Sequence, residues 1–256
     1  MLAELTQKST RVLPCLILSI CTIGIIKLQS QHYHDSTKQS QISKSLQEES
    51  SHKRTIDLQK LIPSLGFNNL RADYLYLSYV QYLGNKEARE DTGYSLIPDY
   101  FETIINYDPH FTEAYLTLST ANSLYAGKPE KTVALMDRVL ESISPEISPE
   151  VSFLWTYKGL DELLYLGDTQ AARKSYLTAA QWALQRGDRT GMQIARRNLN
   201  TAKFLAKNPD TREAQLAAWS LILPNIKDEQ SRQVVIDKIQ ALKSELAVVN
   251  RESKTN

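Results

Sequence analysis

The sequence predicts an all-α protein in which stacked helical hairpins follow a single N-terminal transmembrane helix. A Tyr-x-Gly triplet follows a leucine-rich, aromatic stretch three times, at residues 82–84, 125–127 and 165–167, in steps of 43 and 40 residues. A repeat of this length is typical of stacked helical hairpins. The chain also has only nine glycines, few alternating β-branched runs, and an uncharged run near its N-terminus.

The first segment, residues 1–28, is predicted to be a membrane anchor. Its uncharged run begins at Val12 and ends at Ile26, with basic residues on both sides. As a helix, residues 12–28 would span about 25 Å, slightly less than the hydrocarbon core of a bilayer. We expect a retained single-pass anchor because no small-residue cleavage site follows the run, and a cleaved secretory signal is the alternative. The flanking charges nearly cancel, so the sequence leaves the side of the membrane open.

Residues 29–55 are predicted to be a flexible polar tether. They are rich in serine and glutamine and contain few sizeable apolar side chains, so burial cannot offset the entropy of the chain. A short helix over residues 42–49 is the most structure that we expect here. Three histidines of the tether, His32, His34 and His52, are expected to be solvated, because a metal site needs three or four converging ligands.

Residues 56–188 are predicted to form the hairpin repeats. The first helix of each unit carries an aromatic residue, which is Tyr74, Tyr115 or Trp155, and the second helix carries a large residue such as Phe101 or Tyr176. A proline stands six residues before two of the first-helix aromatics. Small residues between the large ones allow close helix packing, so Trp155 and Tyr176 are expected to pack against each other's helices.

These positions resemble the tetratricopeptide repeat family, whose units read aromatic-x2-Leu-small-x2-Tyr, then Ala-x3-aromatic, then Pro. The most family-like string is Asp-Pro-His-Phe-Thr-Glu-Ala-Tyr at residues 108–115. The units depart from the family because they are about 40 residues long rather than 34, and Lys158 stands where a leucine is usual. The strings at residues 66–74 and 161–168 further resemble a membrane-anchored repeat family of cyanobacteria without an assigned activity.

Residues 189–250 are predicted to form a C-terminal helical cap, and residues 251–256 a disordered tail. Apolar residues recur at helical spacing over residues 192–205, 216–223 and 235–246, and Pro209 and Pro224 separate these segments. Terminal units of a repeat array differ from the inner ones because they cover the last apolar face.

Composition and motifs argue against an enzyme and against nucleic acid as a partner. The net charge is only +1, whereas nucleic-acid-binding proteins present a basic face. The chain contains no GxGxxG, HExxH or GxSxG motif and no phosphate-binding loop. The adjacent carboxylates Asp161 and Glu162 are expected on a solvated face. We therefore expect no catalytic residue, metal, cofactor or small-molecule substrate.

The expected function is binding of a protein partner on the concave face of the repeats. The family's geometry implies a groove lined by Leu75, Tyr79, Glu113, Leu116, Thr120, Phe153, Thr156 and Leu160. This set is apolar and hydroxyl-bearing with one acid, which favours an apolar helix or an extended segment of the partner. Packing between units is the competing explanation for Leu116, Phe153 and Leu160.

The sequence thus predicts a membrane-tethered repeat scaffold that mediates protein–protein interaction, in the assembly or maintenance of a membrane complex. Two alternatives stay open. One is a helical subunit or shell of an enzyme, and the other is a secreted repeat protein with a cleaved signal.

Overall fold

The computed structural model describes residues 21–25, 27, 38–63, 65–148 and 150–255, and these residues form helices and connecting turns without a strand. The chain separates into two units, residues 1–44 and 45–256. In the first unit, residues 21–25 are helical. The predicted anchor, residues 12–26, lies outside the described residues except for that short stretch. Within the described part of the chain, no helix combines the length and the apolar character needed to span a membrane.

The helices follow one another with short connections. Their bounds are α2 (Lys38–Leu61), α3 (Asn68–Gly84), α4 (Lys86–Thr92), α5 (Ile97–Tyr107), α6 (Thr112–Tyr115), the π-helix η1 (Ser119–Tyr125), α7 (Pro129–Ser142), α8 (Val151–Leu164), α9 (Thr169–Leu184), α10 (Arg189–Leu205), α11 (Arg212–Ile222), the 3₁₀-helix η2 (Leu223–Asn225) and α12 (Glu229–Thr255).

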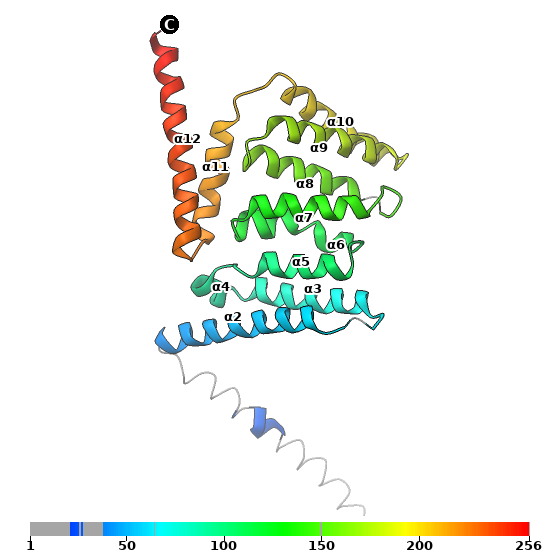
Figure 1. Ribbon diagram of the computed structural model, residues 1–256, viewed down its shortest axis with the longest axis vertical. Helices are drawn as coiled ribbons and strands as arrows, with labels where there is room; N and C mark the ends of the chain where they lie inside the picture. Colours follow the sequence, from blue (N-terminus) through cyan, green and yellow to red (C-terminus); the bar gives the residue numbers. More distant parts are fainter. Residues whose placement is uncertain (1–20, 26, 28–37, 64, 149, 256) are drawn as a thin grey trace, which may run out of the picture. The chain divides into compact units, whose positions relative to one another are not determined.

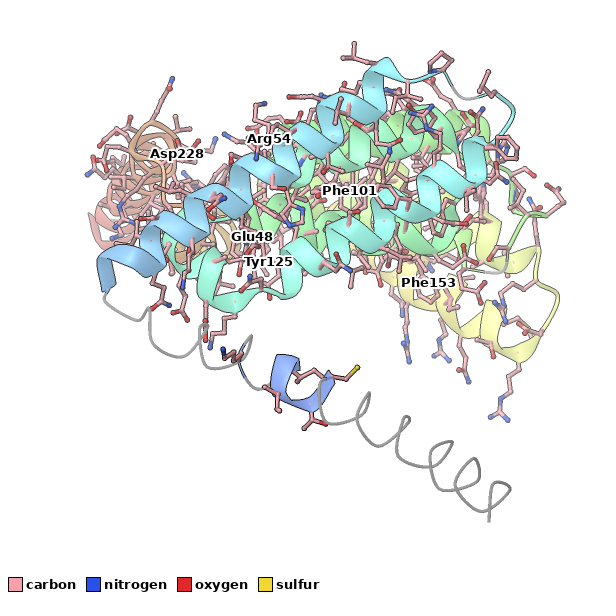
Figure 2. The ribbon with its side chains drawn as sticks, turned by 90° about the horizontal axis from the view of Figure 1, so that it is seen from below. Glu48, Arg54, Phe101, Tyr125, Phe153 and Asp228 are labelled. Carbon is pink, nitrogen blue, oxygen red and sulfur yellow. The ribbon has the colours of Figure 1, made fainter. Side chains whose placement is uncertain are left out.

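The helices of the second unit form a stack of layers that runs from α2 to α10 (Figure 1). Along it, α3 packs on α5, α5 on α7, α7 on α8, α8 on α9 and α9 on α10. Seen from below, α2 and α3 extend from one connection and form the end layer of the stack (Figure 2). Helices α11 and α12 pair with each other, and α11 contacts α8 and η1. The C-terminal pair therefore stands beside the stack, whereas α10 ends it.

Tyrosines fill the core of the first layers. Tyr79, Tyr82, Tyr100 and Tyr115 are almost completely buried, and the Tyr79 ring lies 4.9 Å from the ring of Phe101 on α5. Edge-on and tilted contacts between such rings stabilise a core beyond their buried area. These four tyrosines therefore belong to the interior.

The contact between α8 and α9 follows the predicted pairing of small and large residues. A Cβ atom on Gly159 would lie 3.2 Å from the ring of Tyr176, which is tighter than most Cβ contacts, so glycine favours this approach. On the same two helices, the Trp155 ring meets the Trp182 ring edge-on with centroids 5.8 Å apart. The prediction that Trp155 and Tyr176 pack against each other's helices is confirmed.

Two of the three Tyr-x-Gly glycines adopt the left-handed backbone that ends a helix. Gly127 has a φ of +66° and Gly167 a φ of +69°, a conformation that glycine adopts at no steric cost. A Cβ atom on Gly127 would lie 2.6 Å from Ile226, and one on Gly167 would lie 2.9 Å from Gln215. The recurring triplet thus marks the corners of the stack against which the C-terminal pair packs.

Helix η1 is a π-helix between α6 and α7. Its wide turns are shown by the amide of Ala126, which donates to the Ala121 carbonyl five residues earlier at 3.0 Å. The segment is rich in residues that compete for backbone hydrogen bonds. Its Asn122 and Ser123 side chains are buried, and both donate to the Thr132 hydroxyl of α7, at 2.9 and 2.8 Å. π-Bulges are frequently found at functional sites.

Two boundaries differ from those that the sequence predicts. Residues 38–55, which we expected in the flexible tether, form the larger part of α2. Polar contacts with α3, α4 and α5, described below, replace the apolar burial that this segment lacks. At the other end, α12 continues to Thr255, beyond residue 250 where the disordered tail was expected to begin.

Candidate functional site

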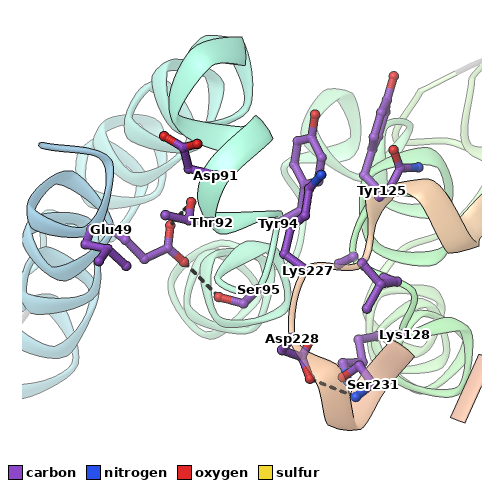
Figure 3. A pocket seen from close by; sticks show the side chains of 14 residues that line it. Glu49, Asp91, Thr92, Tyr94, Ser95, Tyr125, Lys128, Lys227, Asp228 and Ser231 are labelled. Carbon is purple, nitrogen blue, oxygen red and sulfur yellow. Dashed lines mark hydrogen bonds between the residues drawn. The ribbon is translucent and has the colours of Figure 1, made fainter. Parts of the chain in front are cut away.

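A cleft of about 430 Å³ opens where the first layers of the stack meet the start of the C-terminal pair (Figure 3). Helix α2 and the connection from α4 to α5 form one wall, and η2 and the start of α12 form the other. Residues 125–128, at the end of η1, lie between the walls. The cleft is lined by Leu46, Glu49, Asp91, Thr92, Tyr94, Ser95, Tyr125, Ala126, Lys128, Asn225, Ile226, Lys227, Asp228 and Ser231.

Glu49 on α2 is the centre of the first wall. Its carboxylate accepts hydrogen bonds from the hydroxyls of Ser95 at 2.7 Å, Thr92 at 3.1 Å and Tyr82 at 3.1 Å. It also accepts a hydrogen bond from the guanidinium of Arg89. Four donors from α3, α4 and the α4–α5 connection therefore hold one carboxylate of α2, which ties that helix to three other segments.

Arg89 is the cation beneath Glu49, and its side chain is completely buried. It comes from α4, the short helix between α3 and α5. Its guanidinium lies 3.7 Å from the centre of the Tyr82 ring and donates to the Gly93 carbonyl at 2.9 Å. A second carboxylate, Glu48, lies 3.5 Å from it. The pair is both charge-paired and hydrogen-bonded, which a buried ion pair requires in order to be tolerated.

His52, one turn further along α2, was predicted to be solvated and is not. Its Nδ1 lies 2.6 Å from the Tyr100 hydroxyl, and its ring meets the Tyr82 ring edge-on at 5.2 Å. Burial lowers the pKa of His52, and the nearby Glu48 opposes this shift. The histidine thus belongs to the contact that fixes α2, and the prediction of a solvated linker histidine is wrong at this position.

The Tyr94 and Tyr125 rings form the aromatic part of the cleft. Their centroids are 5.0 Å apart, and the rings are tilted by 44°. Both side chains are half-buried, so each keeps one surface accessible. Figure 3 shows the two rings side by side, with their hydroxyls pointing the same way. Burial raises the pKa of the Tyr94 hydroxyl.

Hydrogen bonds in the second wall hold the C-terminal pair, α11 and α12, against the stack. The Lys128 ammonium donates to the Ser231 hydroxyl of α12 at 2.8 Å, and the Asn225 amide donates to the Leu124 carbonyl at 3.0 Å. Lys227 and Asp228 are exposed at the rim. The cleft therefore presents carboxylates and ammonium groups around a tyrosine pair.

A second buried polar cluster lies further along the stack, where η1 meets α8. Asp161 is fully buried, and one of its oxygens accepts from the Ser119 hydroxyl at 2.9 Å while the other has no hydrogen-bond partner. Burial raises the pKa of Asp161 to about 7, and the neighbouring Glu162 adds to this shift. The Ser119 and Ser123 hydroxyls oppose it. The prediction that Asp161 and Glu162 lie on a solvated face is wrong, because the neighbouring π-helix and α9 cover them.

The adjacent Glu162 has the partners that Asp161 lacks. It accepts from the Ser175 hydroxyl at 2.6 Å and forms an ion pair with Lys158 one turn earlier on α8. Lys158 also lies 3.2 Å from Asp137 on α7. Lys158 therefore bridges two helices through carboxylates, which explains why a lysine is tolerated at this buried position.

The eight residues predicted to line a groove do not meet in one pocket, and none of them lines the cleft. Leu75 and Tyr79 are buried in the core, so the prediction that they face a partner is wrong. Their side of α3 packs on α5, which leaves no accessible concave surface there.

The remaining predicted residues divide into two groups. Leu116 and Phe153 are partly buried against the core, and the Thr156 hydroxyl donates to Asn198 at 3.0 Å. For these three residues, packing between layers is the better explanation. Glu113, Thr120 and Leu160 are exposed and lie on three different helices, α6, η1 and α8.

Sequence reasoning identified none of the residues that line the cleft as site residues. Glu49 and Arg89 lie 40 positions apart, and neither belongs to the repeat pattern that the sequence predicts. The one available signal was the Tyr-x-Gly triplet, because it contains Tyr125 and stands beside Lys128.

No family model matches the chain, and neither a curated protein nor a solved structure matches it.

Proposed function

We propose that this chain is a membrane-tethered, tetratricopeptide-like helical repeat scaffold that binds a segment of a partner protein in the cleft. The accessible Tyr94–Tyr125 pair is the observation that carries this proposal. Tyrosine side chains are rigid and amphipathic, and they are enriched among the residues that dominate binding energy at protein interfaces.

The shape and charge of the cleft support a peptide-like occupant. A volume of about 430 Å³ lies near the small end of the range for ligand pockets, so it suits one or two side chains of a longer segment. Asp91 and Asp228 are exposed at its rim together with Lys227. Opposite charges on one rim give a partner segment a preferred direction and register.

Two features support the repeat assignment and the membrane tether. Layers of antiparallel helices that each contact their neighbours are the arrangement that a helical repeat array builds. The uncharged run from Val12 to Ile26 supports the tether. Mass spectrometry of the mature N-terminus tests the tether, because a chain that starts beyond residue 28 would have lost it.

Affinity capture from solubilised membranes, with the full chain as bait, tests the binding site. We expect the wild type to capture a partner, and the double variant Tyr94→Ala/Tyr125→Ala to bind that partner with an affinity about tenfold or more lower. Anchors of this kind contribute about 2 kcal/mol or more to the free energy of binding. Tyr74→Ala is the matched control, because Tyr74 is 48% exposed and lies outside the cleft. A partner bound equally by all three proteins would place the interface elsewhere.

One contact in the cleft bears on the alternative of an enzyme. A lysine that hydrogen-bonds a serine, as Lys128 does with Ser231, is the nucleophile–base pair of some hydrolases. Ser231 lies in the first turn of α12, where its amide donates to the Asp228 side chain at 2.7 Å, so we assign the pair to anchoring that helix. A serine-hydrolase probe that labels the wild type and not Ser231→Ala would favour the enzyme.

A further inference from the structure

Charge is distributed unevenly along the stack, although the whole chain is almost neutral. Residues 169–207, the hairpin of α9 and α10, contain eight basic residues and one acidic residue, a net charge of +7. Residues 45–168 contain ten basic and nineteen acidic residues, a net charge of −9. A strongly basic layer therefore ends a stack whose other layers are acidic.

Helix α10 directs this charge outward. It contains no acidic residue, and its inner side packs on α9 through Ile194, Ala195 and Ala202. Arg189, Arg196 and Lys203 are seven residues apart, so they form one row along the exposed side, with steps of about 10.5 Å. Figure 2 shows nitrogen-tipped side chains that project outward from the yellow part of the ribbon.

The cations of this row are not used within the fold. The ion pairs of the hairpin join Arg186 to Glu150 and Asp188. In the part of the chain that the structure describes, Arg189, Arg196 and Lys203 have no carboxylate within ion-pair distance. At steps of about 10.5 Å the repulsion among the three cations is largely screened at physiological salt, so the row persists without partners in the fold and is accessible to an anionic partner.

Two apolar side chains accompany the row. Met192 is 58% exposed and Phe204 is 56% exposed. By helical geometry they lie on opposite flanks of the row, about 18 Å apart along the helix axis. Charged groups in the middle and apolar groups on both flanks make a surface of about one helix in width.

We propose that the outer side of α10, defined by Arg189, Arg196 and Lys203 with Met192 and Phe204, binds an acidic helix of a partner protein. The partner helix adds a layer to the end of the stack and places carboxylates at seven-residue spacing opposite the three cations. Its apolar residues contact Met192 and Phe204. This surface is separate from the cleft, and it specifies the chemistry of a partner that the proposed scaffold function leaves open.

The dimensions of the surface favour a helix over a nucleic acid. A nucleic-acid strand carries a negative charge about every 3.4 Å. A strand longer than the roughly 25 Å of α10 would meet the other layers of the stack, which carry a net negative charge and repel it. It would also leave Met192 and Phe204 in water. An acidic helix matches both the length of the row and its apolar flanks.

The test uses the full chain in zwitterionic nanodiscs and four probes. The probes are a fluorescent helical peptide with glutamates at seven-residue spacing, the same peptide with glutamines, a single-stranded DNA oligonucleotide and phosphatidylglycerol vesicles. We expect the glutamate peptide to bind, and its affinity to fall about tenfold or more in the triple substitution R189E/R196E/K203E, because three charge pairs are lost. High salt should weaken the binding further.

K53E/R54E/K86E is the control variant, because it makes the same change of charge at exposed positions on α2 and α4. It should bind the glutamate peptide as the wild type does. Peptide binding that survives R189E/R196E/K203E overturns the proposal, as does equal binding of the glutamine peptide. Tighter binding of the DNA or of the vesicles than of the glutamate peptide would assign the surface to a nucleic acid or to a lipid surface instead. Circular dichroism of both variants shows whether the fold is retained.

Discussion

The cluster around Glu49 and the cluster around Asp161 satisfy a buried carboxylate in opposite ways. Glu49 receives three hydroxyls and the guanidinium of Arg89, all from segments other than its own helix. Asp161 receives one hydroxyl, from Ser119, and one of its oxygens is left without a partner. The first arrangement joins a polar helix to the stack, whereas the second makes the stability of the interior depend on pH.

The difference follows from how each contact is built. Helix α2 has almost no apolar side to bury, so its attachment depends on charge and hydrogen bonds to α3, α4 and α5. Helix α8 packs tightly against α9 and η1, so Asp161 is enclosed by the approach of apolar and small residues. Burial without a cation raises the pKa of a carboxyl group because it disfavours the charged form.

The largest effect is expected from Arg89→Met, which leaves Glu49 without its cation. Removal of one partner from a buried ion pair costs about 3–5 kcal/mol in the free energy of unfolding. Urea denaturation measures this loss, and hydrogen exchange should show that α2 opens before the rest of the stack. Lys86→Met on the same helix is the control, because Lys86 is 85% exposed. The double variant Arg89→Met/Glu49→Gln should recover part of the loss, and an equal loss in both variants would contradict the ion-pair explanation.

The next effect is a pH dependence of the free energy of unfolding, which we expect from the cluster around Asp161. In the unfolded chain the Asp161 carboxyl has its usual pKa of 3.8, and in the fold its pKa is about 7. Between these values the folded state holds the proton more tightly, so the free energy of unfolding falls as pH rises from about 4 to 7, by about 4 kcal/mol in all.

Asp161→Asn should remove that slope and be more stable than the wild type above pH 7. Urea denaturation at pH 4.5, 6 and 8 on both proteins checks this. The same slope in the variant as in the wild type would show that another group titrates in this range.

A smaller effect is expected from Ser119→Ala, which removes the hydroxyl that donates to Asp161. Loss of a buried hydrogen bond costs about 1–2 kcal/mol at neutral pH. Because that hydrogen bond lowers the pKa of Asp161, its loss should raise the pKa further. The midpoint of the pH profile of stability should therefore move to higher pH. A loss of stability without movement of the midpoint would attribute the effect to packing alone.

The smallest effect is expected from Ser95→Ala, which removes one of four donors from Glu49. Ser95 is exposed, so water replaces its hydroxyl and the cost should be about 0.5 kcal/mol or less. The melting temperatures of Ser95→Ala and Ser119→Ala should be measured side by side. Ser95 is one of four donors to Glu49, whereas Ser119 is the one hydroxyl that donates to Asp161. Equal shifts would remove the contrast between the two clusters.

Part of the fold and little of the site could be predicted from the sequence. The hairpin α8–α9 follows from helical periodicity, from the small Gly159 and from the large Tyr176, all of which act over short distances along the chain. The eight groove residues were placed by a family register, and the register does not say which side of α3 another helix covers. Leu75 and Tyr79 were misplaced for that reason.

The sequence by itself determined that the chain is helical and that Trp155 and Tyr176 pack between two neighbouring helices. These properties depend on backbone preferences and on the spacing of apolar residues, which are local. Only the tertiary structure decided that Glu49 meets Arg89, that Asp161 is enclosed, and that the basic residues of α10 share one exposed side. Each of these depends on how helices distant in the sequence cross, because electrostatic and desolvation effects are set by distance in space.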